Sequence, residues 1–157
     1  MSIPARQSAA SAGPSNLTVV GTAEMSEPFA VEVQRRTHVT IVQPRGELDL
    51  ATIEMLRSAL DAAIAETLSA ALDGMENGAR LVLDLRGLSF IESTGLHLLV
   101  ALHERAQRDG FQLTLLPPAP PIDRVIQLCG LDQMLPFATP ADAVPADRGW
   151  GALRHVS

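Results

Sequence analysis

Short alternating runs in the first third of the chain predict strands. The run 29–34 alternates large apolar side chains with small or polar ones, which is the two-residue period of a strand with one buried face. A turn near 36–37 leads to a second alternating run at 39–41. Because Pro44 has no backbone N–H to donate, we expect the central pairing of this second strand to stop there.

Two longer segments repeat their apolar residues at the spacing of a helix. From Thr52 to Gly74, apolar side chains fall on one face and charged side chains on the other, and glycine ends the pattern. The segment 94–108 follows the same period and also stops at a glycine. A shorter helix is predicted over 122–129, and 139–142 is typical of the start of a last one.

Two apolar runs, 81–85 and 111–116, complete the predicted strands. The first is continuous, which is typical of a central strand covered on both faces. Strands joined by helical crossovers are parallel, whereas the first two strands are joined by a turn and are antiparallel. The order of elements therefore predicts an α/β fold, a mixed β-sheet of four to five strands with helices packed mainly on one face. The fifth strand would be a brief edge strand at 135–137.

The two ends of the chain show neither the two-residue period of a strand nor the spacing of a helix. Residues 1–26 are rich in Ser, Ala, Gly and Pro, so we expect a disordered N-terminal tail, one domain over 27–145 and a flexible C-terminal tail over 146–157. No basic stretch followed by an apolar run marks a signal peptide. No apolar run reaches the roughly 18 residues of a spanning helix, so we expect no membrane insertion.

Composition argues against several classes of site. The net charge of −6 and the aromatic fraction of 3% argue against a nucleic-acid surface, which needs a cationic face or stacking rings. Cys129 is the only cysteine, so it forms no internal disulfide and no cysteine-rich metal site, and the four histidines lack metal-ligand spacing. The chain has no lysine to complete a phosphate-binding loop. We therefore expect no metal, no cofactor, and a reducing cytoplasmic location.

Positions 92–95, Glu-Ser-Thr-Gly, begin the second long helix and hold the candidate chemistry. Free backbone N–H groups lie at a helix start, and a Ser or Thr commonly caps one of them. Here Ser93 and Thr94 stand side by side, although one hydroxyl is enough for a cap. We expect Phe90 and Ile91 to anchor the preceding loop inward, which turns the next two residues toward solvent. Ser93 is therefore either a plain cap or an accessible functional hydroxyl.

A catalytic role for Ser93 is the weaker alternative. A nucleophilic serine needs a base within hydrogen-bond reach, and the Gly-x-Ser-x-Gly turn of hydrolases is absent around this residue. His97 lies one helical turn further on, so a small serine hydrolase stays open as an alternative, although a surface histidine is the simpler interpretation. We expect that the protein is not an enzyme.

Two motifs, in this order, resemble those of a known family. The first is Gly46-Glu47-Leu48-Asp49, and the second, which follows the apolar strand, is Leu88-Ser89-Phe90-Ile91-Glu92-Ser93-Thr94-Gly95-Leu96. Together they resemble the STAS domain, and more narrowly the bacterial anti-sigma factor antagonists. Members of this family carry Gly-Glu-Leu-Asp near the end of the second strand and Asp-Ser-Ser/Thr-Gly at the start of the second helix. The likeness covers 29–137, and Glu92 stands where Asp is usual.

The resemblance implies a switch in partner binding. In this family the first Ser of the second motif is phosphorylated by an anti-sigma factor that is itself a serine kinase. The unphosphorylated protein binds this kinase and frees the sigma factor, and a serine phosphatase resets the cycle. The matching acceptor here is Ser93, with Thr94 as the second choice. The resemblance also implies a partner-binding surface, formed by Gly46, Glu47, Asp49, Glu92, Ser93, Thr94 and Gly95.

The same fold has other roles among proteins that this chain resembles. The alternative function is a stand-alone STAS regulatory subunit of a stress-sensing complex or of a lipid or anion transporter. Neighbouring genes for a sigma factor and a kinase-like ATPase would favour the antagonist, whereas neighbouring permease genes would favour the transport role.

Overall fold

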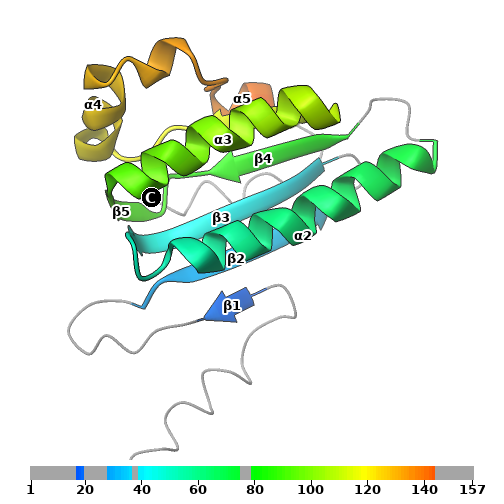
Figure 1. Ribbon diagram of the computed structural model, residues 1–157, viewed down its shortest axis with the longest axis horizontal. Helices are drawn as coiled ribbons and strands as arrows, with labels where there is room; N and C mark the ends of the chain where they lie inside the picture. Colours follow the sequence, from blue (N-terminus) through cyan, green and yellow to red (C-terminus); the bar gives the residue numbers. More distant parts are fainter. Residues whose placement is uncertain (1–16, 20–27, 37–38, 75–78, 144–157) are drawn as a thin grey trace, which may run out of the picture.

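The computed structural model describes residues 17–19, 28–36, 39–74 and 79–143, and Figure 1 shows how they are arranged. The main sheet has the strand order β1-β2-β3-β4-β6. The strands are β1 (Leu17–Val19), β2 (Ala30–Arg36), β3 (Val39–Leu48), β4 (Arg80–Asp84) and β6 (Gln112–Leu116). The pairs β1-β2 and β2-β3 are antiparallel, whereas β4 pairs in parallel with both β3 and β6. The predicted mixed sheet is therefore confirmed.

A further strand, β5 (Leu88–Ile91), pairs in parallel with the last residues of β3. We expected a loop at this position. The burial of β5 explains why its pattern is not visible in the sequence, since Leu88 and Ile91 are buried while the two residues between them are exposed. Such a strand shows neither strict alternation nor a continuous apolar run.

The larger helices pack on one face of the sheet, as predicted. Helices α2 (Ile53–Leu72) and α3 (Ser93–Asp109) cross the same face of the strands (Figure 1). Helix α4 (Pro120–Leu128) adds Ile122 and Ile126 to the same core. Its two N-terminal prolines fall in the first turn, where a missing N–H costs no helical hydrogen bond, so this helix starts earlier than expected.

A smaller core lies on the opposite face. It consists of Val39, Ile41, Val82, Leu116 and Ala143. Ala143 ends the short helix α5 (Pro140–Ala143), which lies where the sequence predicts the start of a last helix. The edge strand expected at 135–137 is reduced to a single parallel bridge between Leu115 and Phe137, which follows the 3-10 turn η1 (Leu131–Gln133).

Pro44 does not end the pairing of β3, contrary to our expectation. It stands opposite Val31 in the β2-β3 ladder, and β3 continues to Leu48. On its other edge, β3 pairs with β4 through 40–42 and with β5 through 46–48. Pro44 falls between these two partners and therefore interrupts neither parallel ladder.

The range 1–26, expected to be a disordered tail, contains β1, which pairs with the outer edge of β2. Residues 1–16 and 20–26 lie outside the described residues. The C-terminal tail expected over 146–157 also lies outside them.

A buried carboxylate ties three strands together. Asp84 is fully buried and accepts hydrogen bonds from the Arg86 guanidinium at 2.9 and 3.0 Å and from the Gln43 amide at 3.0 Å. Gln43, in turn, accepts a hydrogen bond from Gln34 of β2 at 2.9 Å. A charge in the interior is stable only when it is paired and hydrogen-bonded, so this arrangement fixes how β2, β3 and β4 lie against one another.

We predict that Asp84→Ala lowers the free energy of unfolding by about 3 kcal/mol, because it removes a buried carboxylate that accepts hydrogen bonds from Arg86 and Gln43. Urea unfolding monitored by circular dichroism measures the change. The matched control is Glu66→Ala, which removes a carboxylate from an exposed pair with Arg35 and should cost less than about 1 kcal/mol. Equal losses for the two variants would contradict this role of Asp84.

Candidate functional site

Parallel pairing of β5 with the end of β3 brings the two sequence motifs together. Glu47 stands opposite Phe90, and Leu48 stands opposite Ile91. One step further, the Glu92 N–H donates a hydrogen bond to the Leu48 carbonyl at 3.0 Å. Each segment then leaves the sheet and starts a helix, α2 from one and α3 from the other. The motifs therefore meet at one end of the sheet, beside two helix N-termini.

Gly46 allows β3 to change its course at this point. Its φ is +99°, a conformation that residues with a side chain rarely adopt, and the β3-β5 register shifts between Gly46 and Glu47. A Cβ at this position would lie 3.2 Å from the Cα of Phe29. Gly46 is buried, so its effect on the site comes from the backbone geometry that it permits.

Ser93 is the first helical residue of α3, and it is exposed. The N-cap is Glu92, whose carbonyl accepts hydrogen bonds from the N–H groups of Gly95 at 2.9 Å and Leu96 at 3.2 Å. No side chain caps this end of the helix, so the interpretation of Ser93 as a plain cap is wrong. Across the described ranges, no hydrogen bond engages the Ser93 hydroxyl.

The neighbouring hydroxyl has the opposite environment. Thr94 Oγ1 is buried and finds no hydrogen-bond partner within the described part of the chain. A buried hydroxyl without a partner carries a free-energy cost, and an enzyme approaching from solvent has no access to its oxygen. Two adjacent hydroxyls that look equivalent in the sequence are therefore distinguished by the fold, because only Ser93 is accessible.

Gly95 allows the start of α3 to pack closely against the sheet. A Cβ at this position would lie 2.7 Å from Ile91 Cγ1 and 2.9 Å from Leu48 Cδ2. Both distances are shorter than real contacts of a Cβ atom, so only glycine lets the first turn of α3 lie this close to β3 and β5. Gly95 is buried, and its place in the site is that of a spacer beneath Ser93.

Asp49 organises the turn that precedes α2. Its Oδ1 accepts hydrogen bonds from the N–H groups of Ala51 at 3.0 Å and Thr52 at 3.1 Å. The Thr52 hydroxyl accepts the Asp49 N–H at 3.0 Å and donates to the Glu47 carbonyl at 2.7 Å. Reciprocal bonds of this kind stabilise a helix start. Asp49 is thus engaged within its own turn, whereas Glu47 is exposed.

Exposed apolar side chains lie next to these polar residues. We expected Phe90 and Ile91 both to point inward; Ile91 is 9% exposed, but Phe90 is 43% exposed, so half of this expectation is wrong. Leu50, in the turn after β3, is 72% exposed. We call the surface formed by Glu47, Leu50, Phe90, Glu92 and Ser93 the switch surface.

Helix α4 extends the apolar character of this region. It contacts β5, the strand that carries Phe90. Its Val125 and Leu128 are 40% and 76% exposed.

The site does not resemble a metal centre. The described residues contain no group of three His, Cys, Asp or Glu side chains that could hold a metal ion. His97 is exposed one turn beyond Ser93, and within the described ranges no hydrogen bond joins the two side chains. None of the described helices is long and apolar enough to cross a membrane.

Comparisons with known proteins identify the family of the domain. A family model of the STAS domain matches residues 30–143. An anti-sigma F factor antagonist of Paenibacillus polymyxa is 27% identical over 107 residues, which cover 68% of this chain and 84% of that protein. The crystal structure of an anti-sigma factor antagonist from Mycobacterium paratuberculosis is 28% identical, with a TM-score of 0.61, and covers 78% of this chain and 95% of that chain.

One structural neighbour belongs to a much larger protein. The murine anion transporter Slc26a9 matches 87% of this chain with 22% of its own length, at a TM-score of 0.51 and 20% identity. At this identity the likeness shows a shared fold only.

We predict that Gly95→Ala lowers the free energy of unfolding by about 2 kcal/mol, because the added methyl must displace Ile91 or Leu48 in a packed region. The matched control is Ser93→Ala two residues earlier, which removes an exposed hydroxyl and should change stability by less than about 0.5 kcal/mol. Chemical denaturation of both variants tests the difference. A neutral Gly95→Ala would show that the start of α3 is not closely packed.

Proposed function

The chain belongs to the STAS domain family, and on this basis we propose that it acts as an anti-sigma factor antagonist switched off by phosphorylation at Ser93. The unphosphorylated protein binds an anti-sigma factor that is also a serine kinase, and the sigma factor is released. The kinase transfers phosphate to Ser93, and the phosphorylated protein dissociates. A serine phosphatase removes the phosphate and restores binding. The cycle runs in the cytoplasm, where transcription takes place, and needs no cofactor on this chain.

The observation that carries the proposal is the contrast between the two hydroxyls at the start of α3. A kinase must bring the acceptor oxygen in line with the terminal phosphate of ATP, so the hydroxyl has to project from the surface on a rigid element. Ser93 is exposed at the first position of a helix, whereas Thr94 Oγ1 is buried. The same contrast makes Ser93, rather than Thr94, the proposed acceptor.

Phosphate on Ser93 should leave the fold intact. A phosphoserine carries about −1.5 to −2 charges. At the N-terminus of α3 this charge meets the positive end of the helix dipole, an interaction that stabilises anions by about 0.3–1 kcal/mol. No internal contact of Ser93 has to break, because its hydroxyl makes no hydrogen bond within the described ranges. The switch therefore acts on the contact between two molecules.

The apolar part of the switch surface explains how one phosphate can end binding. Phe90 and Leu50 are exposed in the free protein, and a partner that covers them also removes water from around Ser93. The acceptor hydroxyl faces the nucleotide of the kinase, so phosphate on Ser93 is held against the remaining phosphates of ADP. Glu47 and Glu92 add negative charge on the same side. Like charges in an interface cost several kcal/mol, and about 3 kcal/mol is already more than a hundredfold in affinity.

We predict that incubation with ATP and the cognate kinase, found by testing candidate kinases, adds one phosphate and that mass spectrometry locates it on Ser93. Ser93→Ala should abolish the modification, and Thr94→Ala should retain it, because Thr94 Oγ1 is buried. The matched control is Ser89→Ala, which changes an exposed serine on β5 beside the site. Phosphate on Thr94 or Ser89 of the wild-type protein would contradict the proposal.

We further predict that Ser93→Asp weakens binding to the same kinase about a hundredfold, while Ser93→Ala binds as the unphosphorylated protein does. Isothermal titration calorimetry measures both affinities, and circular dichroism should show unchanged secondary structure. The matched control is Ser69→Asp, which places the same charge on the exposed far half of α2 and should bind normally. Normal binding by Ser93→Asp would argue against the switch.

A further inference from the structure

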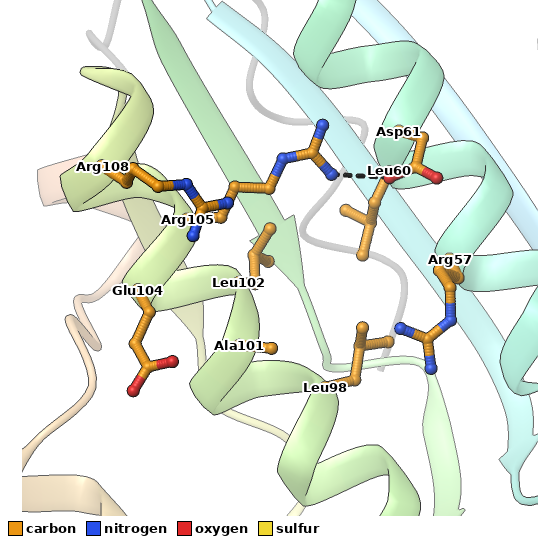
Figure 2. A pocket seen from close by; sticks show the side chains of 9 residues that line it. All are labelled: Arg57, Leu60, Asp61, Leu98, Ala101, Leu102, Glu104, Arg105 and Arg108. Carbon is orange, nitrogen blue, oxygen red and sulfur yellow. Dashed lines mark hydrogen bonds and ion pairs between the residues drawn. The ribbon is translucent and has the colours of Figure 1, made fainter.

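A furrow runs between α2 and α3, on the face of the sheet that these helices cover (Figure 2). Its volume is about 250 Å³. Three leucines, Leu60, Leu98 and Leu102, form its floor and are almost fully buried. Three arginines, Arg57, Arg105 and Arg108, stand around it. Two carboxylates, Asp61 and Glu104, also line the furrow, so three cations and two anions leave the lining with a net charge of +1 in a chain whose net charge is −6.

Of the two carboxylates in the lining, only Asp61 pairs with an arginine of the furrow within the described residues. Arg105 reaches across the furrow to Asp61 at 2.6 Å (Figure 2), and the hydrogen bond that Arg105 donates to the Asp61 carboxylate raises the pKa of Arg105 above its usual range. The Glu104 carboxylate points away from Arg57 and Arg105. Asp61 is therefore already paired, and in the described part of the chain no ion pair joins Glu104 to the arginines of the furrow.

Arg57 and Arg108 make only weak pairs of their own. Arg57 contacts Glu54 at 3.2 Å, and Arg108 contacts Asp109 at 3.4 Å. The Arg108 side chain is 68% exposed. Exposed pairs of this kind contribute little because water screens them, so a carboxylate of a bound partner can replace either one at small cost.

The spacing of the arginines favours a peptide segment over a single small anion. Figure 2 places the Arg57 guanidinium beside Leu98, near one end of the furrow, and Arg108 stands at the other end. Leu98 and Arg108 are ten residues apart on α3, which corresponds to about 15 Å along a helix axis. One phosphate cannot reach both ends, whereas a segment with several carboxylates can.

We propose that this furrow docks an acidic amphipathic segment of the protein partner. Such a segment would lay apolar side chains over the leucine floor and carboxylates toward Arg57 and Arg108, as helices do in grooves of other proteins. Both α2 and α3 begin at the switch surface, so a partner that covers Ser93 reaches the furrow about one helical turn further on. The inference rests on the proposed function only for the identity of that partner, the anti-sigma factor kinase.

A peptide experiment on the full chain tests the furrow without the kinase. The probe is a helical peptide of about 18 residues with leucines on one face and glutamates beside them, and its twin carries glutamine in place of every glutamate. Fluorescence anisotropy should show the glutamate peptide binding about tenfold more tightly than its twin, with the difference reduced at high salt. Amide NMR shifts should map to the facing sides of α2 and α3.

Paired variants provide the control. Arg57→Gln/Arg108→Gln should weaken binding of the glutamate peptide about tenfold. Arg45→Gln/Arg124→Gln, which removes the same charge from exposed arginines outside the furrow, should leave it unchanged. The inference would be overturned by absence of binding, by equal binding of the two peptides, or by equal losses in the two double variants. NMR shifts on another face, or displacement of the peptide by millimolar inorganic phosphate alone, would also overturn it.

The kinase then separates this inference from the proposed function. With wild-type kinase, Arg57→Gln/Arg108→Gln should lower the rate of Ser93 phosphorylation about tenfold at protein concentrations below saturation and leave the saturated rate unchanged. An unchanged rate at both concentrations would overturn docking of this partner in the furrow, while phosphorylation at Ser93 would still support the proposed function. If no candidate kinase modifies Ser93, the proposed function fails, and the peptide experiment still decides the furrow.

Discussion

The switch surface depends on one short parallel pairing, between the end of β3 and β5. This pairing is possible because β3 spans ten residues while its neighbour β4 spans five. The last residues of β3 therefore extend beyond the end of β4 and have a free edge. The uncovered end offers backbone groups that β5 then satisfies, and the Glu92 N–H closes the pairing on the Leu48 carbonyl at 3.0 Å. Had β3 ended at Pro44, the two motifs would have no reason to meet.

Two glycines set the geometry that makes the Ser93 hydroxyl accessible beside this pairing. Gly46 supplies the backbone conformation that shifts the register of β3, and Gly95 lets the first turn of α3 rest on Ile91 and Leu48. The closeness of that contact fixes the rotation of α3 about its axis. Successive helical residues point about 100° apart, so the orientation that buries Thr94 Oγ1 also directs Ser93 into solvent. Accessibility of the proposed acceptor is thus a consequence of packing beneath it.

The sequence predicts the helices and strands that have a clear pattern of apolar residues, and it shows the two motifs. It does not predict the features that depend on which strands lie side by side. Helix α2, the start of α3 and the strands β2 and β6 follow from the spacing of apolar residues, and β4 follows from a continuous apolar run. The expectation for Pro44 is wrong because this residue falls between β4 and β5 on one edge of β3, while the β2-β3 ladder continues past it on the other. Strand β5 shows no period in the sequence, because the two middle residues of its four are exposed. The exposure of Phe90 and the arginine furrow arise from contacts between segments distant in sequence, which no local pattern encodes.

The separation between Ser93 and the furrow limits what a phosphate can do. Arg108 lies fifteen residues along α3 from Ser93, or about 22 Å along the axis, which is well beyond the distance of about 8 Å over which physiological salt screens exposed charges. A phosphate on Ser93 therefore repels groups at the switch surface and leaves the far end of the furrow nearly unaffected. If a partner uses both regions, phosphorylation removes one part of the binding free energy and keeps the other. The released protein would then retain weak affinity for its kinase, with dissociation governed by the switch surface and orientation by the furrow.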